Sequence, residues 1–115
     1  MRVAVSLFLI DEEEKVMGAG PYELLCLVER LGSIRQAALQ MQMSYTKAHR
    51  MVARLERCLP EPVLLRRVGG ADRGGARLTP YGERFLAGYK LMRSHLAQAA
   101  EGEYRQFLES LTPTC

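Results

Sequence analysis

Two short amphipathic runs lie in succession between residues 33 and 59, and they constrain the fold more than any other part of the chain. A serine precedes each run, Ser33 and Ser44, where a hydroxyl can accept a hydrogen bond from a backbone N–H at the start of a helix. The adjacent small residues Ala37 and Ala38 let another helix approach closely. The pattern therefore predicts helices over 34–41 and 45–59, joined by a short turn into a helix-turn-helix over 33–59.

The second of these helices should have two chemically different faces. Apolar residues recur at three- and four-residue spacing and should face a core: Ala48, Met51, Val52, Leu55 and Leu59. The opposite face carries Thr46, Lys47, Arg50, Arg54 and Arg57, bordered by Tyr45 and His49. The second helix of a helix-turn-helix can lie in the major groove of DNA, so we interpret this face as a DNA-reading surface. The alternative is that these side chains are merely solvated.

Basic residues gather in the middle of the chain. Between Arg30 and Arg93, thirteen Lys or Arg residues stand against four acids, a net charge of +9, and the remainder must carry −6 because the whole chain is +3. Four consecutive acids at 11–14 supply much of that remainder. This uneven distribution favours a polyanionic partner, which beside a helix-turn-helix means double-stranded DNA.

A glycine-rich loop separates two short strand patterns after the helix-turn-helix. Four of the seven residues from 69 to 75 are glycines, and the flanking runs 63–68 and 76–79 are rich in β-formers and arginine. A phosphate-binding P-loop would need Lys-Ser or Lys-Thr and a helix after its last glycine, whereas here the chain continues as strand. We therefore predict a wing over 63–79, with arginines on its stems and tip: Arg66, Arg67, Arg73 and Arg77.

The first 32 residues predict a hairpin and a helix. The apolar run 3–10 is too short to span a bilayer, which needs about 20 residues. Four acids follow it, where a signal peptide would have a cleavage site of small residues. We expect a β-hairpin over 3–17 and no membrane partner. Pro21 should open a helix that stops at Gly32. Cys26, Cys58 and Cys115 are widely spaced, which fits a reducing compartment and a cytoplasmic location.

Thr79 and Pro80 should begin a final helix over 80–111. An apolar stripe follows at spacings of three and four residues, and its first two turns are expected to pack on the chain's own core. Too little chain remains to cover the rest, so we expect a homodimer. The expected interface residues are Phe85, Tyr89, Met92, Leu96 and Phe107.

These elements amount to one mainly α domain over 1–115, a winged helix-turn-helix with an N-terminal hairpin and a long C-terminal dimerisation helix. The sequence contains no catalytic constellation, cofactor motif or metal-ligand spacing, so we expect neither an enzyme nor a bound cofactor or metal. Two alternatives stay open. A winged helix can serve as a protein-docking module, and single-stranded nucleic acid or RNA is a third choice, disfavoured because Tyr45 is the one aromatic residue on the basic face.

The chain resembles the N-terminal winged-helix domain of the ModE molybdate-responsive regulators and, more distantly, LysR-type DNA-binding heads. The residues that carry the resemblance are Gly32-Ser33-Ile34, Ala37-Ala38, Ser44-Tyr45, Ala48, Gly69-Gly70 and the run from Gly74 to Gly82. The resemblance implies a homodimeric transcriptional regulator whose recognition helix starts at Ser44-Tyr45. His49 stands where these regulators often carry tryptophan.

The site expected from the sequence is a DNA-binding surface built from both halves of the motif. Its residues are Arg35, Ser44, Tyr45, Thr46, Lys47, His49, Arg50, Arg54, Arg66, Arg67, Arg73 and Arg77. The sequence ends at Cys115, without room for the C-terminal domains that bind molybdate in the full-length regulators, so molybdate is not expected to bind this chain. The alternative function is an interaction module that partners a separate oxyanion-sensing protein.

Overall fold

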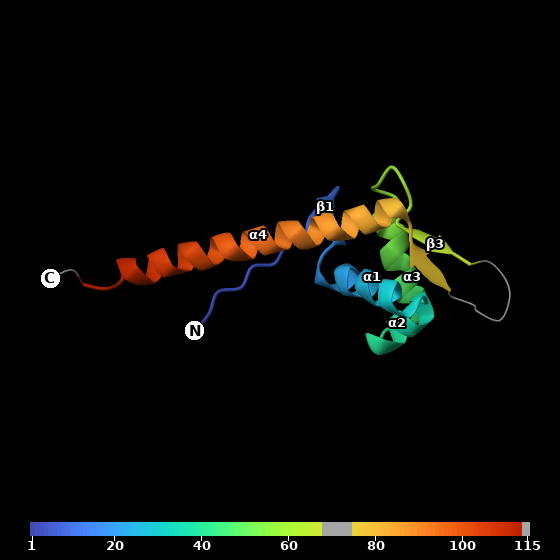
Figure 1. The fold of residues 1–115 in the computed structure, drawn as a ribbon, viewed down its shortest axis with the longest axis horizontal. Helices are drawn as coiled ribbons and strands as arrows, with labels where there is room; N and C mark the ends of the chain where they lie inside the picture. The colour runs from blue at the N-terminus through green and yellow to red at the C-terminus, as the bar shows by residue number, and fades with distance from the viewer. Residues whose placement is uncertain (68–74, 114–115) are drawn as a thin grey trace.

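Three short helices and two hairpins form a head from which one long helix projects (Figure 1). The computed structural model describes residues 1–67 and 75–113. The elements are, in chain order, β1 (Leu9–Asp11), β2 (Glu14–Met17), α1 (Ala19–Leu31), α2 (Ile34–Gln40), α3 (Tyr45–Glu56), β3 (Leu64–Arg66), β4 (Ala76–Leu78) and α4 (Pro80–Ser110). This is the predicted winged helix, and the 31 residues of α4 give the molecule its long axis of 73 Å.

The core lies where the three short helices meet the two hairpins. Buried side chains come from every element of the head except β1, and the largest of those that are almost fully enclosed are Met17, Leu24, Leu25, Ile34 and Leu55. The two alanines of α2, Ala37 and Ala38, are buried, which permits the close helix packing that their size predicted. Burying each large aliphatic side chain contributes roughly 1.5–3 kcal/mol, so this core is the main source of the head's stability.

Side-chain caps fix where three of the helices begin. The Ser33 Oγ accepts a hydrogen bond from the Gln36 N–H (3.1 Å), and the Ser44 Oγ accepts one from the Lys47 N–H (3.0 Å). Thr79 does the same at α4, accepting from the Gly82 N–H at 2.9 Å. These three predicted caps are confirmed. Each satisfies an N–H that the helix itself leaves unpaired, worth about 1 kcal/mol.

Three observed element ends differ from the expected ones by two residues or more, at β1, α1 and α3. β1 begins at Leu9 rather than Val3, because β2 is short and the β1–β2 sheet offers residues 3–8 no partner strand. α1 begins at Ala19, so Pro21 lies inside the first turn, where its missing N–H is tolerated. α3 ends at Glu56 rather than near Leu59, because the N–H groups of Cys58 and Leu59 bond three residues back and tighten the chain into turns.

The wing is anchored to the head at its base. The Ala76 N–H donates to the Gly32 carbonyl (3.1 Å), and an isolated bridge joins Ser33 to Gly75. On the other strand, the Glu56 carboxylate accepts from the N–H groups of Val63 (2.8 Å) and Leu64 (3.2 Å). The wing base is therefore fixed to both the helix-turn-helix and the end of α3. The predicted wing-tip residue Arg73 lies outside the described residues.

The first turns of α4 are fastened to the loop before the wing. The Thr79 hydroxyl donates to the Pro62 carbonyl at 2.7 Å. Gly82 lies so close to Val63 that a Cβ at this position would overlap the Val63 carbonyl. A glycine is therefore required here for the approach of two backbones.

Tyr89 was expected in the dimer interface, but the structure buries it within its own chain. Its side chain is only 3% exposed, its ring lies 5.4 Å from that of Tyr22 between centroids, and its hydroxyl donates to the Leu7 carbonyl at 2.7 Å. Tyr89 is therefore a core residue of its own chain, because the extended N-terminal segment runs beside α4 and covers it. Phe85 is half-buried against the same core, while Met92, Leu96 and Phe107 are exposed.

Among the residues that the structure describes, no helix combines the length and apolar character that crossing a membrane would require. The same residues contain no group of three or more His, Cys, Asp or Glu side chains that could hold a metal ion.

Candidate nucleic-acid interface

The outer face of α3 is open and basic near the start of the helix. Thr46, Lys47, His49 and Arg50 are exposed, whereas the inner residues Ala48, Val52 and Leu55 are buried. Within residues 1–67 and 75–113, neither Lys47 nor Arg50 forms an ion pair with an acid. Both cations are therefore available to an external anion, and they lie on the helix that a helix-turn-helix presents to a groove.

An aromatic residue links α2 to this face. The Arg35 guanidinium lies 4.9 Å from the centroid of the Tyr45 ring, and the Tyr45 and His49 rings are 6.1 Å apart between centroids. A cation over a ring is attracted by the ring face without losing its charge. Arg35 is thus held beside the start of α3 as a cation, a contact between helices that the separate sequence patterns did not reveal.

Ser44 has a positioning role in this geometry. Its Oγ is the acceptor that caps α3 through the Lys47 N–H. The turn before it includes Gln42 in the left-handed region, with φ at 56°. The Met43 N–H bonds back to the Ala38 carbonyl at 3.0 Å. These contacts set the angle at which α3 leaves α2.

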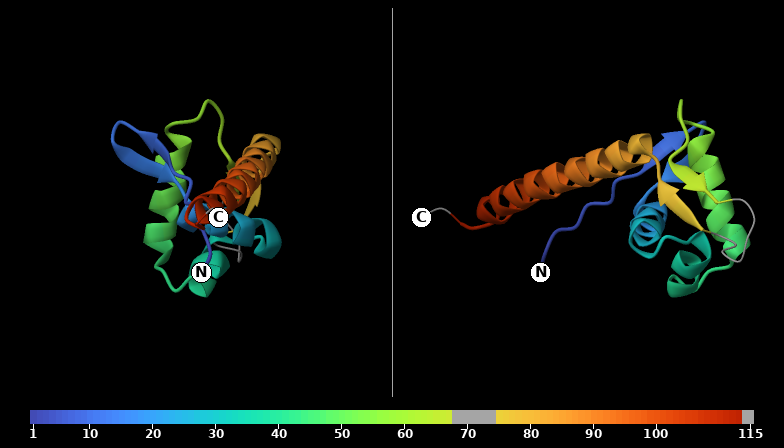
Figure 2. Two further views of the ribbon diagram at one scale, coloured as in Figure 1. Left: turned by 90° about the vertical axis from the view of Figure 1, so that its left-hand side faces the viewer. Right: turned by 45° about the vertical axis from the view of Figure 1, so that its right-hand side comes forward.

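Two of the expected DNA contacts are instead ion-paired within the chain. The Arg54 Nε lies 2.6 Å from a carboxylate oxygen of Glu14, and an Arg66 guanidinium nitrogen lies 3.6 Å from Glu56. Arg54 is diverted because β2 packs beside the C-terminal part of α3, which Figure 2 shows. Neither arginine was assigned an acidic partner from the sequence. For Arg54, the available signal was the acidic run at 11–14 in a chain with a strongly basic α3.

The wing presents two arginines, Arg67 and Arg77, on its outer face. Arg77 is exposed and pairs across the strands with Leu65, which is also exposed. Arg67 is exposed as well, and its backbone N–H donates to the Gly75 carbonyl at 2.9 Å. The wing and the start of α3 thus form two basic surfaces on one head, while the acidic β1–β2 turn lies by the far end of α3 (Figure 2).

The thiol of Cys58 is not activated as a nucleophile. Desolvation, together with the neighbouring carboxylate of Asp11, raises the pKa of the Cys58 thiol. A raised pKa keeps the thiol protonated near neutral pH, and the thiolate is the nucleophilic form. Cys58 is therefore no candidate for nucleophilic catalysis.

Comparisons with known proteins match the part of the chain that carries this geometry. The family described as "Bacterial regulatory helix-turn-helix protein, lysR family" matches residues 22–83, from α1 to the first turn of α4.

Several curated proteins are also similar to the chain. "Molybdenum transport protein ModE" of Azotobacter vinelandii is 37% identical over 89 residues, 77% of this chain and 30% of that protein. "Molybdenum-pterin-binding protein MopB" of Rhodobacter capsulatus is 38% identical over 71% of this chain and 30% of its own length. "Transcriptional regulator ModE" of Haemophilus influenzae is 39% identical over 60% of this chain and 27% of its own length. The chain thus spans less than a third of each of these relatives.

Proposed function

The chain belongs to the lysR family of bacterial regulatory helix-turn-helix proteins, and we propose that it acts as a homodimer that reads a specific sequence in double-stranded DNA. Its family is one of DNA-binding transcriptional regulators rather than enzymes, and its ModE-type relatives agree with that class. Beyond this class, the proposal states how the protein recognises a DNA sequence, which residues do so, and that two copies of the chain assemble.

The observation that carries the proposal is the open basic start of α3. Lys47 and Arg50 lie on one exposed face with Thr46 and His49, and the Ser44 cap fixes the helix that presents them. Side chains near the start of a recognition helix reach base edges in the major groove, where Lys and Arg favour guanine. We therefore assign base reading to this face, with Tyr45 and Arg35 beside it.

The wing supplies the second part of the proposed interface. Arg67 and Arg77, on its outer face, suit contacts with phosphates, which position a protein on DNA without reading its sequence. Arg73 would join them at the tip. Arg54 and Arg66 are left out of the proposed contacts, because Arg54 is directed toward Glu14 of the acidic hairpin and Arg66 is half-buried beside Glu56.

Homodimerisation is proposed from the outer part of α4. Met92 and Leu96 are each 40% exposed and Phe107 is 54% exposed, so the residues that the structure describes leave this stripe partly uncovered. The helix is also electrically asymmetric: residues 80–95 carry three cations and one acid, a net +2, and residues 96–110 carry three acids and one cation, a net −2. Two copies running antiparallel would place each basic half beside an acidic one, so we propose that orientation.

A salt titration with duplex DNA tests the central claim. Contacts with roughly six to ten phosphates would lower the affinity by about 10³-fold or more between 50 and 200 mM salt. Lys47→Ala or Arg50→Ala should remove about 1–3 kcal/mol of preference for the specific site over random duplex. Arg2→Ala is the matched control, because it removes the same charge from the N-terminus, which lies away from α3 (Figure 1).

Other outcomes would redirect the proposal. Affinity that does not change with salt, or no binding to any duplex, would favour the alternative of a docking module that partners a separate oxyanion-sensing protein.

Phe107→Glu should yield monomers with unchanged helix content. Its control is Leu91→Glu, because Leu91 is an exposed leucine on another side of α4. We further propose that molybdate leaves DNA affinity unchanged, and a molybdate-dependent shift would contradict that.

A further inference from the structure

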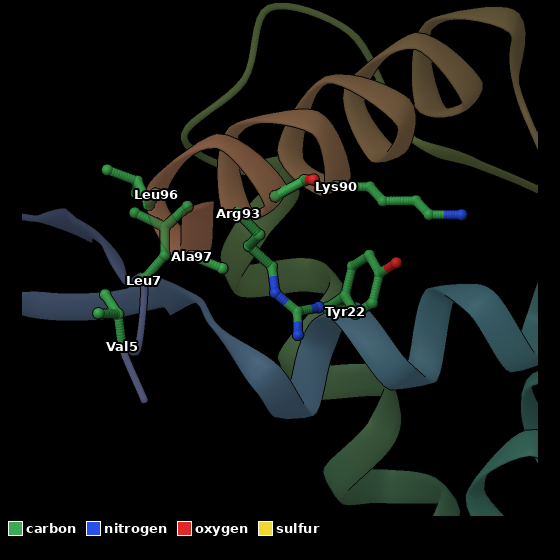
Figure 3. Close-up of a pocket in the computed structure, with 8 residues that line it drawn as sticks. Val5, Leu7, Tyr22, Lys90, Arg93, Leu96 and Ala97 are labelled. Carbon is green, nitrogen blue, oxygen red and sulfur yellow. The ribbon is translucent and has the colours of Figure 1, made fainter. Parts of the chain in front are cut away.

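A hollow of about 360 Å³ lies where the N-terminal arm, residues 1–8, passes beside α4 (Figure 3). We call it the arm–helix hollow. Its walls come from the arm, from α1 and from the middle of α4, and the Tyr89 hydroxyl holds the arm in place through the Leu7 carbonyl. The hollow therefore lies at the junction between the head and the projecting helix, away from the basic face of α3.

The two ends of the arm–helix hollow differ in chemistry. Arg93 points toward Tyr22 and Lys90 extends beyond that ring, while Val5, Leu7, Leu96 and Ala97 gather at the other end (Figure 3). No acidic residue is among those that line it. A cavity with cations at one end and aliphatic groups at the other suits a ligand with the same division.

Arg93 is held in place without being neutralised. Its guanidinium lies 4.4 Å from the centroid of the Tyr22 ring and 5.9 Å from that of Tyr89. In the described part of the chain, no carboxylate forms an ion pair with Arg93 or Lys90. Two aromatic rings thus fix the direction of a planar, permanently charged donor, which can bind a carboxylate through two parallel hydrogen bonds.

We propose that the arm–helix hollow binds a small amphipathic anion, a carboxylate that carries a short aliphatic chain. The carboxylate would bind Arg93, and the chain would lie on Val5, Leu7 and Ala97. The volume suits a chain of moderate length, which an inorganic oxyanion would not fill. This site is separate from the DNA-reading surface, and it does not depend on the proposed function.

The hollow is also largely distinct from the stripe assigned to dimerisation. Phe85, Met92 and Phe107 follow one line along α4, and none of them lines the hollow. Arg93 and Ala97 lie one helical turn apart on the neighbouring line, and Leu96 is the residue common to both surfaces. The charged end of the hollow therefore lies off the dimerisation stripe.

Calorimetric titration of the whole chain with octanoate, below its micelle-forming concentration and without DNA, tests the proposal. Octanoate should bind at one site per chain, whereas acetate, sulfate and 1-octanol, which each lack one half of the ligand, should bind at least about tenfold more weakly. Arg93→Gln should weaken octanoate binding by a similar factor. Arg105→Gln is the matched control, because it makes the same change three turns further along α4.

A second variant keeps the test independent of any effect of Arg93 on folding. Ala97 is exposed on α4, so Ala97→Trp should fold, fill the aliphatic end and abolish octanoate binding. Equal binding by 1-octanol, or unchanged octanoate binding in Arg93→Gln and Ala97→Trp, would overturn the proposal. So would dissociation of a dimer by octanoate in sedimentation, because the hollow would then belong to a subunit contact.

Discussion

The two hairpins of the head have the same architecture and opposite charge. Each is a two-stranded antiparallel sheet that contributes buried side chains to the core of the head. The β1–β2 turn consists of acids, two of which, Glu12 and Glu13, have positive φ, whereas exposed arginines lie on the β3–β4 hairpin. A hairpin's topology therefore does not tell what it contacts, and the charge of its side chains has to be read separately.

The hairpins differ equally in how they are attached. β1–β2 is held by the buried Val16 and Met17 and by one partly exposed ion pair, Glu14–Arg54. The base of the wing is held by backbone hydrogen bonds, by Glu56 and by the close approach of α4. A hairpin that positions charges on a ligand needs a rigid attachment to the head. The difference in attachment between the two hairpins can be tested by substitutions, beginning at the base of the wing.

The largest effect is expected at Gly82. Gly82→Ala would push a Cβ into the Val63 carbonyl, and neither backbone can move without disturbing the Thr79 cap, so we expect a loss of about 3 kcal/mol in the free energy of unfolding. Gly88→Ala is the control, because a Cβ there meets nothing within 4 Å; it should stabilise the helix by about 0.5–1 kcal/mol. Equal denaturation curves for the two variants would refute this anchoring of the wing.

The next effect concerns the carboxylate under the wing. Glu56→Ala leaves the N–H groups of Val63 and Leu64 without their acceptor and Arg66 without its ion pair. We expect a loss of about 2–3 kcal/mol, measured by urea unfolding. Glu61→Ala removes an exposed carboxylate from the same connection and should change stability by less than about 0.5 kcal/mol. A comparable loss in both variants would mean that Glu56 acts through charge alone.

A smaller effect is expected on DNA. Arg77→Ala should lower affinity for specific and random duplexes alike, and reduce the slope of log affinity against log salt by about 1, as the loss of one phosphate contact does. Fluorescence anisotropy over a range of salt concentrations measures both quantities. A change confined to one DNA sequence would instead give Arg77 a role in base reading.

The smallest effect belongs to the acidic hairpin. Glu14→Gln breaks the ion pair with Arg54, whose partners are 54% and 40% exposed, so stability should fall by less than about 1 kcal/mol. The freed Arg54 should raise affinity for random duplex slightly more than Glu12→Gln, which makes the same charge change without releasing an arginine. Equal DNA affinities in the two variants would show that Arg54 stays away from DNA even when unpaired.

The sequence predicted local features of the fold well. Ser33, Ser44 and Thr79 cap helices as expected, since a cap depends on residues within one turn. It failed where a contact joins distant segments. Arg54 meets Glu14 forty residues earlier, and Tyr89 meets the Leu7 carbonyl, 82 residues away. The strand expected from Val3 begins at Leu9, because β-propensity cannot supply a partner strand.

In the candidate site, too, local features were predictable and contacts between distant segments were not. Lys47 and Arg50 are exposed as the helical periodicity predicted, because a well-capped amphipathic helix orients its own faces. The ion pairs of Arg54 and Arg66 were not predictable, since each depends on how a hairpin packs against α3.

The division of α3 into two faces has a consequence for how such a protein can change its target. Ala48, Val52 and Leu55 hold the helix in the head, while positions 46, 47, 49 and 50 are exposed and bury nothing. Substitutions at exposed positions usually change stability by less than about 0.5 kcal/mol. Under the proposed base reading by this face, new operator preferences can therefore arise, or be engineered, by exchanging those four side chains on an unaltered scaffold. Binding specificity could then diverge faster than the fold that displays it.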